Sequence, residues 1–322
     1  MVADRRLRTT QVFDTYWRFA AARQEVYQAR LREDPHPWTA DPILATYRFT
    51  NCYRAADRVS QYLIKEVIYR GSQDVDEVLF RILLFKFFNR ISTWQLLVSA
   101  FGELSWATFR VDRYDEVLIK ALSRGERIYS PAYVMPSPKF GGLRKHTNHL
   151  LLLQHMLHEG LRCRLEAGRS MAEGFDVLRG YPGIGDFLAF QLLIDINYST
   201  MINFDEMDFV VSGPGARDGL RKCFGPGVRG IEADLIRYMS DTQAEHFARL
   251  GLRFGGLNGR SLQLIDCQNL FCEVDKYARV AHSEILGYSG RTRIKQRFRP
   301  VDQPVTSWFP PKWGVNAVGP AH

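Results

Sequence analysis

A glycine-rich turn between two helical patterns constrains the fold of this chain more than any other feature. Residues 180–185 read GYPGIG, and apolar side chains recur before and after them at the three- and four-residue spacing of an α-helix. Gly183 and Gly185 let the backbone turn sharply and approach a phosphate without a Cβ atom in between. Ile184, between them, is expected to anchor the turn in the core. The stretch predicts two helices joined by a hairpin whose backbone N–H groups face an anion.

The remainder of the chain is also helical in pattern, which predicts an all-α fold. No series of segments alternates apolar and polar residues in the way that strands do. We expect helices over 10–32, 41–69, 74–90, 92–101, 112–123, 146–167, 170–179, 186–198, 215–223, 230–249 and 261–285.

A long loop and a basic tail divide the sequence into three parts. Residues 124–142 are rich in Pro and Gly and predict a loop between two lobes. The expected parts are an N-terminal helical lobe over 1–142, a lobe with the hairpin over 143–286, and a tail over 287–322. In the tail, cations interleave with aromatic residues, which suits contact with a phosphate backbone, and packing of the tail over the core is the alternative. The residues are Arg291, Arg293, Lys295, Arg297, Arg299, Lys312, Phe298, Trp308, Phe309 and Trp313.

The charge balance favours a polyanionic partner. The chain has 43 Lys and Arg against 35 Asp and Glu, a net charge of +8. Arginine, which forms planar bidentate pairs with phosphate, supplies most of the excess.

Several other classes of protein receive no support. Five cysteines at wide spacing indicate reduced thiols in a cytoplasmic protein, and the two near the end cannot build a four-cysteine iron–sulfur site. No apolar signal segment begins the chain, and no run of 18 apolar residues could span a membrane. The sequence contains no nucleotide-binding loop, so no nucleotide cofactor is expected. Nothing indicates an obligate protein partner. His155, His158 and Glu159 lack a third ligand at an evident spacing, so no metal is expected.

Three acids after the hairpin are the candidate catalytic groups: Asp205, Glu206 and Asp208. Cleavage of an N-glycosidic bond develops positive charge on the sugar, and a fixed carboxylate stabilises that charge or activates a water molecule. The alternative for each acid is a helix cap or a surface carboxylate.

Two further segments are candidate binding sites. Within residues 47–58, side chains recur at helical spacing and are expected to line a cleft, with a solvated helix face as the alternative. These base-pocket candidates are Tyr47, Asn51, Arg54 and Arg58, with Arg48 and Asp57 beside them. The second segment begins a helix that could contact DNA through Gly213, Gly215, Arg217 and Lys222, although a plain helix start explains it equally well. Residues 271–277 are a weaker candidate, for which a helix-surface ion pair is the simpler explanation.

Residues 37–64, 180–185 and 203–224 together resemble the helix-hairpin-helix DNA glycosylase superfamily. More specifically, they resemble its α-glutamyl/putrescinyl thymine pyrophosphorylase-like branch, which is related to the helical domain of 5-hydroxymethyluracil DNA kinases. The resemblance implies a two-lobed helical fold. It also implies a catalytic Asp about twenty residues after the hairpin, which is Asp205 by ungapped count. The pattern of the branch around Glu206 and Phe209 places Asp208 first, before Asp205 and Glu206.

The same resemblance implies an enzyme that flips a base out of double-stranded DNA. The expected activity is that of a DNA N-glycosylase that excises a modified pyrimidine, such as α-glucosyl-hydroxymethylcytosine, from phage DNA in antiviral defence. Phe187 replaces the Lys of strand-cleaving relatives, so a monofunctional enzyme that leaves abasic sites is expected. One alternative is a hypermodification enzyme that displaces pyrophosphate from 5-pyrophosphoryloxymethyl-deoxyuridine. The other is a non-catalytic helix-hairpin-helix module that binds DNA.

Overall fold

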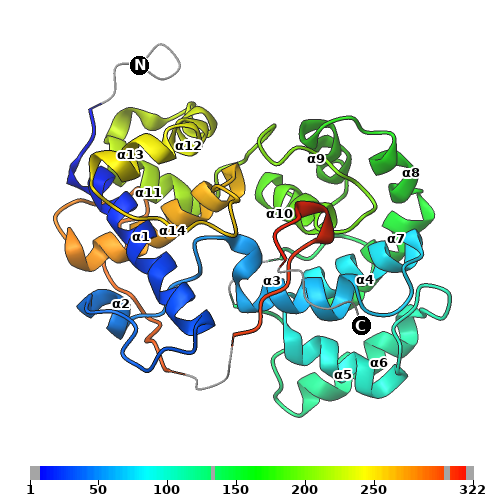
Figure 1. Cartoon of the computed structure of the whole chain (residues 1–322). Coiled ribbons are helices and arrows are strands. Elements are labelled where there is room, and N and C mark those ends of the chain that lie inside the picture. Colours follow the sequence, from blue (N-terminus) through cyan, green and yellow to red (C-terminus); the bar gives the residue numbers. More distant parts are fainter. Residues whose placement is uncertain (1–7, 132–134, 301–304, 317–322) are drawn as a thin grey trace. The chain divides into compact units, whose positions relative to one another are not determined.

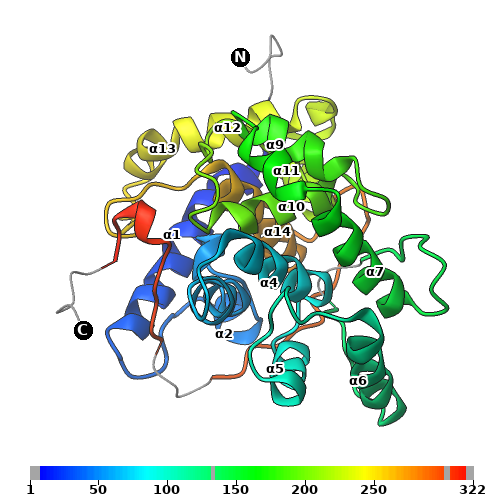
Figure 2. The same cartoon turned by 90° about the vertical axis from the view of Figure 1, so that its right-hand side faces the viewer.

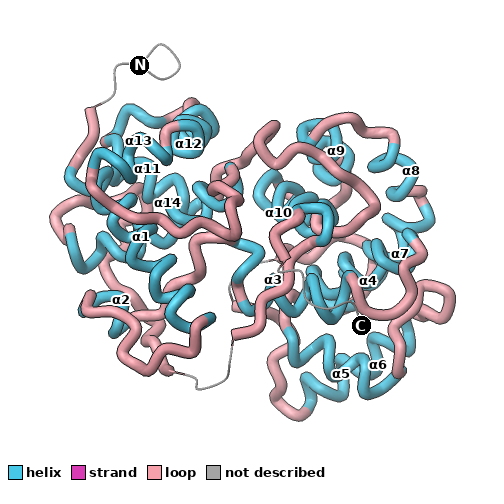
Figure 3. Tube along the Cα trace, viewed as in Figure 1, coloured by secondary structure: helices cyan, strands magenta, loops and turns pink. Residues whose placement is uncertain are grey.

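Helices make up all the regular structure of the described residues. The computed structural model describes residues 8–131, 135–300 and 305–316, and in these ranges the only β-structure is two isolated bridges (Figures 1 and 3). The predicted all-α fold is therefore confirmed. All five cysteines are free. Among the described residues, no helix combines the length and apolar character needed to cross a bilayer.

The chain forms two compact units whose boundaries differ from the expected ones. A terminal unit contains residues 1–57 and 209–322, and a central unit contains residues 58–208. These units are bounded after residues 57 and 208, whereas the expected boundaries lie after 142 and 286. The physical reason is that the first helix packs with the last helices of the chain, which no local pattern reveals.

The core of the terminal unit is built from one N-terminal and two C-terminal helices. Helix α14 packs against α1 and α11. A Cβ atom at Gly219 would lie 2.1 Å from the carbonyl oxygen of Phe271, so α11 and α14 cross with their backbones in contact. The elements are α1 (Gln11–Leu31), α2 (Pro42–Thr46), η1 (Arg54–Ala56), α11 (Pro214–Phe224), η3 (Pro226–Val228), α12 (Glu232–Asp241), α13 (Gln243–Arg249), α14 (Leu264–Ala281) and η4 (Pro311–Trp313).

The central unit is built around two largely buried helices, α4 and α10. Lys86 of α4 forms a buried ion pair with Asp195 of α10, with 2.7 Å between Nζ and Oδ2. The elements are α3 (Arg58–Tyr62), the π-helical turn η2 (Leu63–Ile68), α4 (Val75–Phe88), α5 (Ile91–Phe101), α6 (Val111–Ser123), α7 (Lys145–His158), α8 (Leu161–Glu166), α9 (Met171–Arg179) and α10 (Asp186–Asn197).

The expected helix over 41–69 is wrong. Helix α2 ends at Thr46, and the backbone of residues 46–48 pairs with the tail instead. The Arg48 N–H donates to the Gln296 carbonyl at 3.1 Å, and the Phe298 N–H donates to the Thr46 carbonyl at 2.9 Å. These bonds take the backbone groups that a continuous helix would have used. The expected helices over 146–167 and 230–249 are likewise each divided in two, the first at Gly160, whose φ is +68°.

The described part of the tail packs on the terminal unit. The Phe298 ring contacts the Trp38 ring edge-on with 6.3 Å between centroids, and Phe309 is buried. Residues 301–304 and 317–322 of the expected tail lie outside the described residues, as do residues 132–134 of the expected loop.

Candidate functional site

The predicted hairpin is present in the central unit. Helices α9 and α10 pack against each other, and residues 180–185 join them (Figures 1 and 2). Gly183 has a φ of +78°, which favours glycine, and Ile184 is buried as expected. Arg179 of α9 and Asp186 of α10 form an ion pair across the turn. The hairpin is thus fixed from both sides.

Of Gly183 and Gly185, only Gly185 is open to a ligand. A Cβ atom at Gly183 would lie 3.1 Å from the Pro138 Cβ, so the long loop covers this side of the turn. At Gly185 a Cβ atom would have no neighbour within 4 Å. Gly185 precedes α10 and gives no side-chain hydrogen bond to the first N–H groups of that helix. The Gly185 end is therefore the sterically open end of the hairpin.

The loop that carries Asp205, Glu206 and Asp208, called the acidic loop below, packs on α9 and α10. The Asn197 side chain, at the end of α10, accepts from the Phe204 N–H at 2.9 Å and donates to the Phe204 carbonyl at 3.1 Å. Gly174 of α9 makes room for the Phe204 ring, since a Cβ atom there would lie 2.8 Å from it. The loop is thus held against α9.

The three acids have different environments. Asp208 is exposed, and its Oδ2 accepts the Met171 N–H at 3.0 Å, so it satisfies a backbone group at the start of α9. Asp205 is exposed and accepts the Met207 N–H at 2.8 Å, while Glu206 is buried. Asp208 and the hairpin lie at opposite ends of α9, which are roughly 13 Å apart at 1.5 Å per residue. This spacing equals about four nucleotides at a rise of about 3.4 Å each.

The segment around α11 is chiefly structural. Lys222 is buried, with 3.0 Å between its Nζ and Oδ1 of Asp275, which corrects the prediction that it contacts DNA. A Cβ atom at Gly215 would lie 3.1 Å from the Cys272 sulfur, so this glycine permits close packing on α14. Gly213 is buried as the residue before α11, and Arg217 is exposed and donates to the Ser212 hydroxyl at 3.1 Å.

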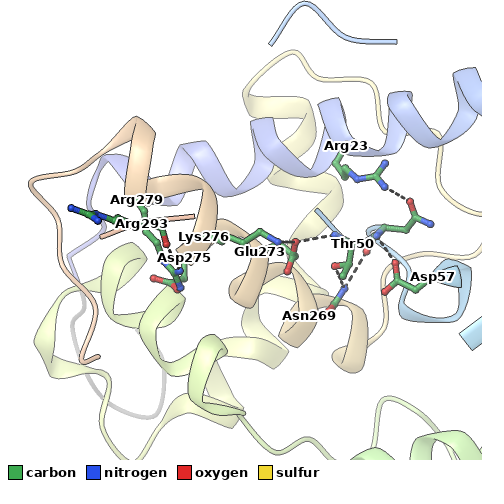
Figure 4. A network of polar contacts seen from close by, with 10 residues as sticks. Arg23, Thr50, Asp57, Asn269, Glu273, Asp275, Lys276, Arg279 and Arg293 are labelled. Carbon is green, nitrogen blue, oxygen red and sulfur yellow. Dashed lines mark hydrogen bonds and ion pairs between the residues drawn. The ribbon is translucent and has the colours of Figure 1, made fainter. Parts of the chain in front are cut away.

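One face of α14 positions the segment with the predicted base-pocket residues (Figure 4). Glu273 accepts the Thr50 N–H at 2.9 Å and pairs with Lys276 at 2.8 Å. Asn269 donates to the Thr50 hydroxyl at 3.2 Å and to the Asn51 carbonyl at 3.1 Å. The side chains recur three and four residues apart and so share a face. The weak candidate over 271–277 is therefore a largely buried polar anchor and not a surface ion pair.

Two further bonds extend this anchor toward both ends of the segment. Asp266 accepts the Arg54 N–H at 2.8 Å, and Tyr277 donates to Asp41 at 2.7 Å. Arg54 itself is 5% exposed. Arg58, in contrast, is exposed and opens α3 in the central unit. The predicted base-pocket set therefore does not form one helix face.

Asp57 is an acid of this network whose pKa is strongly raised. Its Oδ1 accepts the Asn51 N–H at 2.7 Å, and Arg23 of α1 donates to the side-chain oxygen of Asn51. Burial raises the pKa of the Asp57 carboxyl from 3.8 to about 7, and the nearby Glu273 adds to the rise. Part of the residue remains accessible. A partly accessible carboxyl that titrates near neutrality is suited to proton transfer.

A small pocket lies in the terminal unit beside this network. Its volume is about 40 Å³, and the described residues that line it include two arginines and several aromatic rings but no acid. Arg30 lies over the Trp38 ring, 5.0 Å from the centroid. Burial lowers the pKa of Arg23 and of Arg30, yet arginine stays charged at neutral pH. Of the predicted base-pocket residues, Tyr47 lines this pocket. The other lining residues are Arg23, Val26, Arg30, His36, Pro37, Trp38, Thr39, Leu44, Ala45, Phe49 and Phe298.

The two arginines of this pocket were not predicted from the sequence. Arg23 and Arg30 are seven positions apart, which places them on one face of α1, and this was the available signal. One nitrogen of Arg23, Nη1, is buried without a hydrogen-bond partner within the described residues. Over those same residues, no group of three or more His, Cys, Asp or Glu side chains could hold a metal.

Comparisons with known proteins identify the family. The profile described as 5-hmdU DNA kinase, helical domain, matches residues 10–287. A 5-hmdU DNA kinase of Bacillus phage SP10 is 25% identical over 285 residues, which cover 83% of this chain and 45% of the relative. The chain thus spans about half the length of that curated relative. No solved structure matches. The chain belongs to the family of 5-hmdU DNA kinase helical domains.

Proposed function

We propose that this chain is a DNA-modifying enzyme that acts on a pyrimidine whose 5-hydroxymethyl group carries a phosphate or pyrophosphate ester. The small pocket of the terminal unit that Arg23 and Arg30 line, called the arginine pocket below, would bind that ester. The enzyme would then replace the ester with an amine. The observation that carries the proposal is the pairing of two arginines with aromatic rings in a pocket whose described lining contains no acid.

The chemistry of the pocket supports an anionic and not a neutral substituent. Arginine forms bidentate, charge-assisted hydrogen bonds with phosphate oxygens. A buried guanidinium nitrogen without a partner, as in Arg23, is costly unless a ligand satisfies it. A pocket of about 40 Å³ has room for roughly three water-sized groups, since one water needs about 10–15 Å³. That room suits the oxygens of one phosphoryl group, and the pyrimidine ring would remain outside.

The relative's name supports the same class of substrate. A kinase that acts on 5-hydroxymethyl-deoxyuridine in DNA leaves a phosphate ester on the 5-methylene carbon. The present sequence has no phosphate-binding loop of the GxxxxGK[ST] kind, so we place this chain after such a kinase and not in its role.

In the proposed reaction, the bond between the 5-methylene carbon and the ester oxygen breaks, and the amine nitrogen bonds to that carbon. Negative charge grows on the leaving (pyro)phosphate, where Arg23 and Arg30 would stabilise it. The amine loses one proton, for which we propose Asp57 as the acceptor because its pKa is near 7. The open Gly185 end of the hairpin would contribute a backbone phosphate contact.

Oligonucleotides that differ only at the 5-substituent test the proposal. Their affinities are compared for thymine, 5-hydroxymethyluracil and the phosphate and pyrophosphate esters, and nucleoside mass spectrometry follows the products in the presence of amines. We expect tighter binding of the esters, loss of that preference in Arg30→Gln, and no loss in Arg18→Gln, an exposed position of the same helix. Equal affinity for neutral and anionic substituents would refute the proposal.

A second candidate function, removal of a modified pyrimidine by an N-glycosylase, has support from the central unit. The acidic loop packs directly on α9 of the hairpin, and Asp205 in that loop is exposed. Incubation with unmodified, hydroxymethylated and glucosylated double-stranded DNA distinguishes the two functions. A glycosylase releases free base and leaves alkali-labile abasic sites, and it should lose this activity in Asp205→Asn or Asp208→Asn. Binding without conversion of any substrate would indicate the non-catalytic module.

A further inference from the structure

We propose that residues 291–299 together with Arg48 form a basic track that binds the phosphate backbone of one DNA strand. The inference rests on the proposed action on DNA and adds where the strand would lie. It follows from the exposure, spacing and anchoring of the cations on the terminal unit.

The cations of the track are exposed and follow a period of two. Every odd position from 291 to 299 is Arg or Lys, and each of these five residues is exposed, whereas Ile294 and Phe298 are half-buried. Alternate residues of an extended chain face opposite sides, so this pattern directs the cations to one side. None of the five forms an ion pair within the part of the chain that the structure describes. They therefore retain their full charge for an external anion.

The backbone of the track is fixed at several points. Pairing with residues 46–48 holds Gln296 and Phe298, and it places exposed Arg48 beside the track. Arg279 of α14 donates to the Arg293 carbonyl at 3.1 Å, and Figure 4 shows these two residues next to each other. A fixed row of cations loses less conformational entropy on binding than a free tail would lose.

The dimensions of the track suit a nucleic acid strand. Cations two positions apart are separated by about 6.6 Å in an extended chain, and residues 291–299 span about 26 Å. At a rise of about 3.4 Å per nucleotide, this length follows about eight nucleotides of one strand. Phe298 of the track and Tyr47 beside it also line the arginine pocket. A strand on the track would therefore bring a 5-substituent close to that pocket.

The salt dependence of binding to unmodified single-stranded DNA tests the track. Each phosphate contact contributes a slope of about −0.7 to the logarithm of affinity against the logarithm of salt concentration. We expect Arg293→Gln/Arg297→Gln to reduce the slope of the full chain by about 1.4. The matched control, Arg18→Gln/Arg253→Gln, changes two exposed arginines of the same unit and should leave the slope within about 0.3 of the wild-type value. Far-UV circular dichroism checks the folding of both variants.

Either of two results would overturn the track: an unchanged slope in Arg293→Gln/Arg297→Gln, or an equal reduction in the control. Unmodified DNA carries no ester at the 5-position of its pyrimidines, so this result is independent of the ester that the arginine pocket is proposed to bind. A failed track with intact conversion of the esters leaves the proposed function standing. A normal track with no conversion of any substrate removes the proposed function alone.

Discussion

Replacement of Asp57 by Asn should make the terminal unit less sensitive to pH and more stable in mild alkali. The pKa of the Asp57 carboxyl is raised from 3.8 to about 7, so the folded state holds a proton that the unfolded chain has released. For such an acid, the stabilisation is complete below about pH 4 and is lost as the pH rises through 7. Three pKa units at about 1.36 kcal/mol each correspond to about 4 kcal/mol. Because part of the residue is accessible, we expect between about 2 and 4 kcal/mol.

Asparagine suits this test because it keeps an oxygen that accepts the Asn51 N–H and carries no charge at any pH. Two compact units need not unfold together, so stability is best measured as hydrogen exchange in peptides from α1 and α14. Wild type should lose protection between pH 5 and 8, and Asp57→Asn should lose much less. Asp14→Asn, at a side chain that is 46% exposed, serves as the control. An identical loss of protection in wild type and Asp57→Asn would refute the reasoning.

One further prediction concerns Asp57, and three concern Lys222, Gly219 and Gly185. If Asp57 accepts the proton of the amine, conversion of the ester should rise with pH through a midpoint near 7, and Asp57→Asn should flatten the profile. Lys222→Met removes one of the two ion-pair partners that the described residues give buried Asp275 and leaves Arg279, so urea unfolding should show a loss of about 3 kcal/mol while the salt slope of DNA binding stays unchanged. Gly219→Ala places a Cβ atom 2.1 Å from a backbone oxygen and should destabilise the terminal unit by more than the typical 1–3 kcal/mol of overpacking, measured by the same unfolding assay. Gly185→Ala has no such contact and should cost less than about 1 kcal/mol. Weaker DNA binding by Gly185→Ala would support the hairpin as a phosphate contact, and unchanged affinity would argue against it.

Local patterns predicted much of the helical structure. The helices over 11–31, 75–88, 91–101 and 186–197 lie within two residues of their expected bounds, because caps and apolar periodicity are local properties. The pattern over 47–58 misled, since its spacing of three and four matched a helix that the backbone does not form. The backbone there pairs with residues 296–298 instead of forming a helix. Because this partner lies about 250 positions away, the periodicity of a short sequence segment cannot indicate it.

The sequence by itself determined that the chain is helical, that a glycine hairpin joins two of its helices, and that its charge favours an anion. Only the tertiary structure decided which charges serve which purpose. It buries Lys222 in an ion pair and lets the Asp208 carboxylate accept a hydrogen bond from the backbone N–H of Met171 at the start of α9. It also brings Arg23, Trp38 and Phe298 to one pocket. The physical reason is that desolvation and contact depend on which distant segments pack together, whereas helix formation depends on neighbours three and four residues away.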